Sequence, residues 1–163
     1  MTEVEASLLV EASLAETWDR YFDPGGWQAW VDGFGEVISS EGYPEVGGTL
    51  RWSSTPAGRG EVIETVAEHH PRRLHRIDFV DPQTEGELTT TFEIRGEATH
   101  VAQRLAYRLV SGGPFGWVSD KLFIRSQQRG SIQRSLLGLK HEVEEAAHFA
   151  DRGQPGSVPP RFT

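Results

Sequence analysis

The order of the expected elements constrains this chain more than any single motif does. Residues 3–12 alternate apolar and mostly acidic side chains, the period-two pattern of a half-buried strand. Six further strand-like runs follow at about 34–40, 48–55, 59–68, 73–80, 86–95 and 99–110. The short turns between them favour antiparallel hairpins over crossover helices. A single long helix closes the chain, so we expect one curved sheet against one helix, with a pocket between them.

Helices are expected on both sides of this series of strands. Ser13 and Glu16 form a capping-box pattern, in which the serine oxygen binds a free helix N–H and the glutamate reaches back. A Pro-Gly-Gly break near residue 24 ends this first helix, and a second short helix is expected over 27–31. After a Gly-Gly-Pro sequence at 112–114, apolar residues recur at helical spacing to about residue 149.

Composition narrows the class of protein. The 163 residues suit one domain over 1–150, followed by a Pro- and Gly-rich tail at 151–163 that we expect to be mobile. The net charge of −8 argues against a nucleic-acid partner. No apolar run approaches the ~20 residues of a membrane span, and the N-terminus lacks a signal-peptide pattern, so we expect a cytoplasmic protein. The absence of cysteine excludes disulfides, thiolate metal sites and thiol nucleophiles.

Several short motifs together resemble a known fold family. They are the opening strand into Ala12-Ser13 and Thr17-Trp18, then Trp27-x-x-Trp30, Gly47-Gly48 before Arg51-Trp52, Pro71-Arg72-Arg73-Leu74, and Gly112-Gly113-Pro114. Over about residues 3–150 this pattern resembles the START-like superfamily, also called the helix-grip or SRPBCC fold, and within it the bacterial polyketide cyclase/dehydrase-like branch.

The resemblance implies an α+β helix-grip fold. Its parts are a seven-stranded curved antiparallel sheet around a long C-terminal helix, two short helices after the first strand, and a ligand cavity under the long helix. Members of the superfamily bind lipids, hormones and polyketides, act as cyclases, or contact chaperones. The resemblance therefore implies an architecture and not one activity.

Candidate ligand-binding residues are polar or aromatic groups on expected inward faces. Gln103 and Tyr107 alternate with apolar residues on one strand, and Thr90 does so on another. Such groups orient a ligand in an apolar pocket, or alternatively bond locally within the sheet. Trp30 and Trp52 either face the same pocket or serve only as core packing.

Charged candidates are fewer. His75 shares a strand face with apolar residues and is a weak candidate for catalysis, although a structural role is the simpler interpretation. Asp78, another weak candidate, points to the opposite face because its spacing from His75 is odd. Arg125 and Arg129 lie on the apolar stripe of the final helix. They either offer cations to a ligand, with Arg125 also a weak catalytic candidate, or lie in solvent beyond the sheet.

We expect neither a metal nor another cofactor. His141, Glu145 and His148 share a helix face, but that face lies opposite the apolar stripe and should meet water. Gly130 and Gly138 interrupt the long helix off its apolar stripe, with no explanation at this level.

Three functions remain open. The favoured one is binding of a small hydrophobic or amphipathic ligand, lipid- or polyketide-like, by a monomer or homodimer. The second is a polyketide cyclase or aromatase, which predicts that Gln103, Tyr107 and Arg125 meet in one cavity. The third is a chaperone-activator-like interaction domain, which predicts a filled core and an exposed apolar patch.

Overall fold

A computed structural model describes the backbone of residues 1–110 and 117–153, without the side chains of 117–120. The expected helix start at Gly112–Pro114 and residues 154–163 of the expected tail lie outside the described residues. Over the described part of the chain, seven strands and four helical segments follow one another: β1 (Thr2–Val10), α1 (Leu14–Tyr21), η1 (Pro24–Gly26), α2 (Trp27–Trp30), β2 (Phe34–Glu41), β3 (Thr49–Ser54), β4 (Glu61–His70), β5 (Leu74–Val80), β6 (Thr84–Arg95), β7 (Ala98–Leu109) and α3 (Trp117–Arg152).

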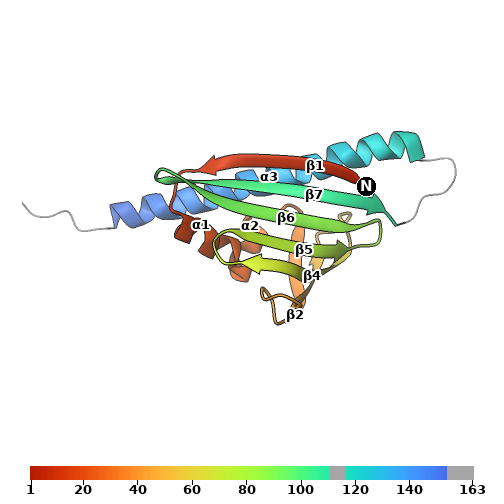
Figure 1. Cartoon of the computed structure of the whole chain (residues 1–163), viewed down its shortest axis with the longest axis horizontal. Coiled ribbons are helices and arrows are strands. Elements are labelled where there is room, and N and C mark those ends of the chain that lie inside the picture. The colour runs from red at the N-terminus through yellow and green to blue at the C-terminus, as the bar shows by residue number, and fades with distance from the viewer. Residues whose placement is uncertain (111–116, 154–163) are drawn as a thin grey trace, which may run out of the picture.

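The strands form one antiparallel sheet in the order β1-β7-β6-β5-β4-β3-β2, and α3 runs along it beside β1 (Figure 1). The helix-grip fold expected from the sequence is therefore confirmed, and each strand lies within two residues of its predicted bounds. Register shifts in the pairing of β2 with β3 and of β4 with β5 mark bulges. Such bulges increase the local twist and bend, which curves the sheet toward the helices.

The core lies between the inner face of the sheet and the apolar stripe of α3. Ile132, Leu136, Leu139 and Val143 on that stripe are all buried. The capping box of α1 is also present, since the Ser13 hydroxyl accepts the Glu16 N–H and the Glu16 carboxylate accepts the Ser13 N–H. The buried stripe of α3 and the cap of α1 are thus present where the sequence predicts them.

Gly138 explains how α2 approaches α3 so closely. A Cβ placed on Gly138 would lie 2.9 Å from the Trp30 carbonyl oxygen and 3.0 Å from its Cα. Only a residue without a side chain permits this contact. Two further bonds anchor the segment after α2, because the Asp32 N–H donates to Ser135 Oγ and Arg134 pairs with the Asp32 carboxylate. Gly138 therefore faces α2, which the sequence did not reveal.

Candidate functional site

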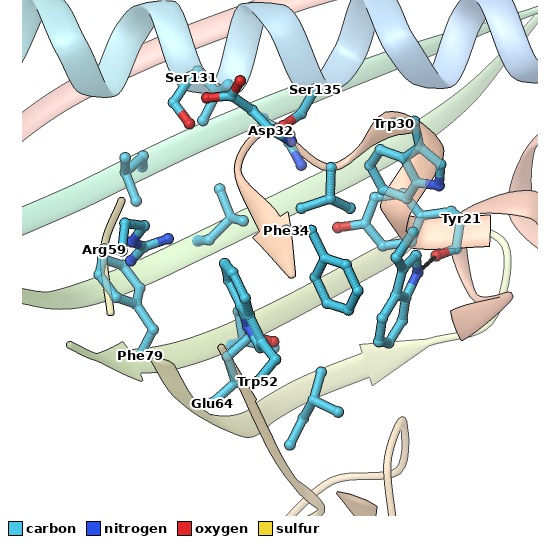
Figure 2. Close-up of a pocket in the computed structure, with 18 of the residues that line it drawn as sticks. Tyr21, Trp30, Asp32, Phe34, Trp52, Arg59, Glu64, Phe79, Ser131 and Ser135 are labelled. Carbon is cyan, nitrogen blue, oxygen red and sulfur yellow. Dashed lines mark hydrogen bonds between the residues drawn. The ribbon is translucent and has the colours of Figure 1, made fainter. Parts of the chain in front are cut away.

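A cavity lies between the sheet, α2 and α3. It has a volume of about 110 Å³. Aromatic and aliphatic side chains form most of its wall, and polar groups from α3, the sheet, the segment after α2 and the β3–β4 connection complete it (Figure 2). The lining side chains are Tyr21, Trp27, Trp30, Val31, Asp32, Phe34, Tyr43, Leu50, Trp52, Arg59, Glu64, Ile77, Phe79, Leu88, Gln103, Leu105, Gln128, Ser131, Ile132 and Ser135.

Glu64 is the most unusual group in this wall. It lies on β4 between the buried Val62 and Val66, so its side chain points inward. Its carboxylate accepts a hydrogen bond of 2.9 Å from Trp52 Nε1. Burial raises the pKa of the Glu64 carboxyl, while the Trp52 bond and the charge of Arg59 lower it by less. A carboxyl of this kind can exchange a proton closer to neutral pH than an exposed one can.

Arg59 carries the positive charge of the cavity. Its guanidinium lies 4.9 Å from the centre of the Phe79 ring and 5.8 Å from that of Trp52, within cation–π range (Figure 2). Its Nε donates to Asp81 Oδ2 at 2.8 Å. Asp81 is buried and also accepts the Gln83 and Thr84 N–H groups and the Thr84 hydroxyl. Despite burial, Arg59 and these donors hold the pKa of Asp81 below its ordinary value, which keeps the pair charged.

Hydrogen bonds between uncharged side chains hold the part of the wall that Tyr21 and Gln103 form. The Tyr21 and Thr90 hydroxyls are 2.9 Å apart, and Gln103 Nε2 donates to Thr90 Oγ1 at 3.2 Å. Burial raises the pKa of Tyr21 to about 12, so this phenol stays neutral. Thr90 is fully buried behind the wall and does not line the cavity itself. Its role here is to hold the two side chains that do.

The structure places the other candidates in different parts of the molecule. Trp30 and Trp52 line the cavity, as Gln103 does. Tyr107 lies four residues beyond Gln103 on β7, about 13 Å along the strand. It faces a separate hollow near the N-terminus. Arg125 is exposed on the first turns of α3, which reach past the start of β1 (Figure 1). The convergence of Gln103, Tyr107 and Arg125 expected for a cyclase is therefore not formed.

Arg129 is also exposed and does not belong to the cavity wall, where Gln128 stands instead. Asp78 points outward, on the face opposite His75, as its spacing indicates. The outward helix face carries His141 and Glu145 as an exposed pair. Within residues 1–110 and 121–153, no three side chains that commonly bind metals come together.

His75 is buried outside the cavity wall, in a cluster of rings. Its Nδ1 lies 3.0 Å from Nδ1 of His69, and the rings of Phe22 and Tyr43 meet it edge-on. Burial, together with the neighbouring His69, lowers the pKa of His75 to about 4. An imidazole of this kind is neutral at neutral pH and supports the wall formed by Tyr43.

Sequence reasoning missed Asp32, Arg59, Glu64 and Asp81, the charged groups in and next to the cavity wall. For Glu64 a signal existed, because it alternates with Val62 and Val66 just as Gln103 alternates with apolar neighbours. Arg59 and Asp81 lie in connections between strands, where no periodicity indicates which way a side chain points.

Residues 1–144 match the family described as polyketide cyclase / dehydrase and lipid transport. The chain therefore belongs to this family. No curated protein matches the sequence. Among the described residues, no helix is long and apolar enough to cross a membrane.

Solved structures share the fold at low identity. The protein TTHA0849 from Thermus thermophilus is 24% identical, with a TM-score of 0.70 over 90% of this chain and 99% of its own. The Zhui aromatase/cyclase from Streptomyces sp. R1128 is 19% identical, with a TM-score of 0.70 over 96% and 99%. A START superfamily protein from Mycobacterium smegmatis is 12% identical, with a TM-score of 0.70 over 88% and 98%. These likenesses extend to the fold alone.

Proposed function

We propose that this protein binds a small, largely apolar molecule in the cavity between the sheet, α2 and α3. The observation that carries the proposal is the cavity itself, which has a volume of about 110 Å³ and a wall that is mostly aromatic and aliphatic, with polar groups among these side chains. Ligand sites generally combine an apolar lining with a small number of orienting polar groups. The family description, which includes both cyclases and lipid transport, agrees with a ligand in this position.

The test is an NMR titration with a panel of neutral single-ring and short-chain compounds. Trp30 and Trp52 line the cavity, so their indole N–H signals should shift on saturation. Leu88→Phe fills the cavity from the sheet side and should abolish these shifts. Leu8→Phe is the matched control, because Leu8 is also a partly buried leucine packed against the core but does not line the cavity. Equal binding by the two variants would contradict the proposal.

A cyclase-type enzyme is the second candidate, and Glu64 is the observation that favours it. Cyclisation of a carbonyl chain begins with removal of a proton next to a carbonyl group. The Glu64 carboxylate would take this proton, and the C–H electron pair would form an enolate that accepts a hydrogen bond from the Tyr43 hydroxyl. Acetophenone in D₂O tests this step, because catalysed exchange would remove its methyl proton signal. Exchange at the same rate with wild type and Glu64→Gln would exclude this role.

The interaction-domain alternative predicts a filled core. A core that contains this cavity gives that alternative less support than the other two.

A further inference from the structure

The charges around the cavity are paired in a way that bears on its ligand. Asp32 lines the wall and is bound by Arg134 through two hydrogen bonds of 3.0 and 3.1 Å. Arg59 lines the wall and is bound by Asp81. Asp81 is held in place by its own three hydrogen bonds from residues 83 and 84, so it cannot turn away to release Arg59. Each of these positive charges is therefore neutralised within the protein.

Glu64 has no cation of its own. The Glu64 carboxylate accepts its hydrogen bond from the neutral indole of Trp52. The positive charge of Arg59 acts on Glu64, but Arg59 is already paired with Asp81. Among the described residues, Arg59 is the only cationic side chain in the cavity wall. The net charge at the cavity is thus zero or negative, depending on the proton of Glu64. An anionic ligand would meet only a guanidinium whose charge Asp81 already neutralises, and burying a charge without a counter-charge is costly.

Neutral polar groups remain on the wall for a ligand to bind. Gln128 and Ser131 line the cavity from α3, and Tyr43 lines it from the connection between β2 and β3. Together with the carboxyl of Glu64, they offer hydrogen-bond donors and acceptors to a carbonyl, amide or hydroxyl group. An apolar cavity of about 150 Å³ binds benzene, so a cavity of about 110 Å³ has room for no more than about one ring.

We infer that the cavity takes a neutral single-ring compound bearing a carbonyl, amide or hydroxyl group. The Glu64 carboxylate repels a carboxylate of the same shape, and Arg59 does not offset this repulsion because Asp81 already neutralises its charge. This inference rests on the proposed function, because it names the ligand class of the same cavity. Glu64 is then the residue that determines specificity.

Benzamide and benzoate form a matched pair of probes, because they differ in charge but hardly in shape. At pH 7.5 we expect wild type to bind benzamide at least about tenfold more tightly than benzoate, since only benzoate carries a charge into the cavity. Both affinities are measured from the indole N–H shifts of Trp30 and Trp52. This comparison needs no variant and so does not depend on a substitution that fails to fold.

Glu64→Gln tests whether Glu64 causes the preference for benzamide over benzoate. Glutamine keeps the shape and can still accept the Trp52 bond, but it carries no negative charge. We expect this variant to bind benzoate more tightly than wild type does, and to narrow the benzamide preference at least about threefold, because like-charge repulsion is removed. Arg51→Gln is the control, because Arg51 pairs with Glu61 at the surface and does not line the cavity.

Three results would overturn the inference while leaving the proposed function intact. One is a wild-type preference for benzoate that Arg59→Gln removes, since Arg59 would then be a receptor for anions. Another is binding of other panel compounds with no response to benzamide. The third is a preference for benzamide over benzoate that is unchanged in Glu64→Gln. If no compound shifts the two indole signals, the cavity proposal fails and the inference fails with it.

Discussion

His75 should make the stability of this protein depend on pH. The side chain is 2% exposed, and its pKa is lowered to about 4 by burial and by His69. In the unfolded chain the pKa of histidine is near 6.5. Between these values the unfolded state binds the proton and the folded state does not, so the free energy of unfolding falls as the pH falls. The contribution is intact above pH 6.5 and is lost progressively down to about pH 4.

The expected magnitude follows from the two pKa values. Each pH unit inside the window costs about 1.4 kcal/mol for one proton, so lowering the pH from 7 to 5 should remove about 2 kcal/mol of stability through His75. The shifted pKa of Glu64 acts in the opposite direction, because a buried carboxyl with a raised pKa favours the folded state at low pH. That term is common to wild type and a His75 variant and cancels in their difference.

Urea unfolding at pH 7 and pH 5 measures this difference. His75→Leu removes the imidazole, so its free energy of unfolding should fall by about 2 kcal/mol less than that of wild type between the two pH values. His148→Leu removes an exposed imidazole from α3 and should behave like wild type. Equal losses in wild type and His75→Leu would refute the argument that burial keeps this histidine neutral.

Three further predictions test contacts that support the fold around the cavity. Gly138→Ala should destabilise the protein by about 1–3 kcal/mol through overpacking against Trp30, although alanine favours a helix. Gly130→Ala is the control and should be neutral or stabilise the protein by up to about 1 kcal/mol. Equal melting temperatures for the two variants would contradict the close contact between Gly138 and Trp30. Thr90→Val should cost about 1–3 kcal/mol in urea unfolding by leaving buried tyrosine and glutamine groups unpaired, and no loss would mean that these bonds contribute little. Ser13→Ala should cost about 1 kcal/mol by removing the helix cap, again measured by urea unfolding.

Most of the fold could be predicted because it depends on local patterns. Alternation along a strand determines which face is buried, and the turn residues between the runs make the neighbouring strands antiparallel. The Ser13 cap and the apolar stripe from Ile132 to Val143 likewise depend on residues within a few turns of each other. The bounds of all seven strands followed from signals of this range.

The candidate site could be predicted only in part. Inward alternation indicated Gln103, which lines the cavity, but it also indicated Tyr107, which lies on the same strand face and about 13 Å farther along the strand. The helical stripe included Arg125 and Arg129, because periodicity does not tell where a helix extends past the sheet. These two arginines are exposed for that reason.

By itself, the sequence determined the order of the elements, the hairpin connections and the faces that turn inward. Tertiary structure alone decided which charges meet, because Asp32 and Arg134 are 102 residues apart and Arg59 and Asp81 are 22 apart. It also decided how much space remains, since the volume of the cavity depends on the distance that Gly138 allows between α2 and α3. Such distances arise from the packing of whole elements, and no local pattern encodes them.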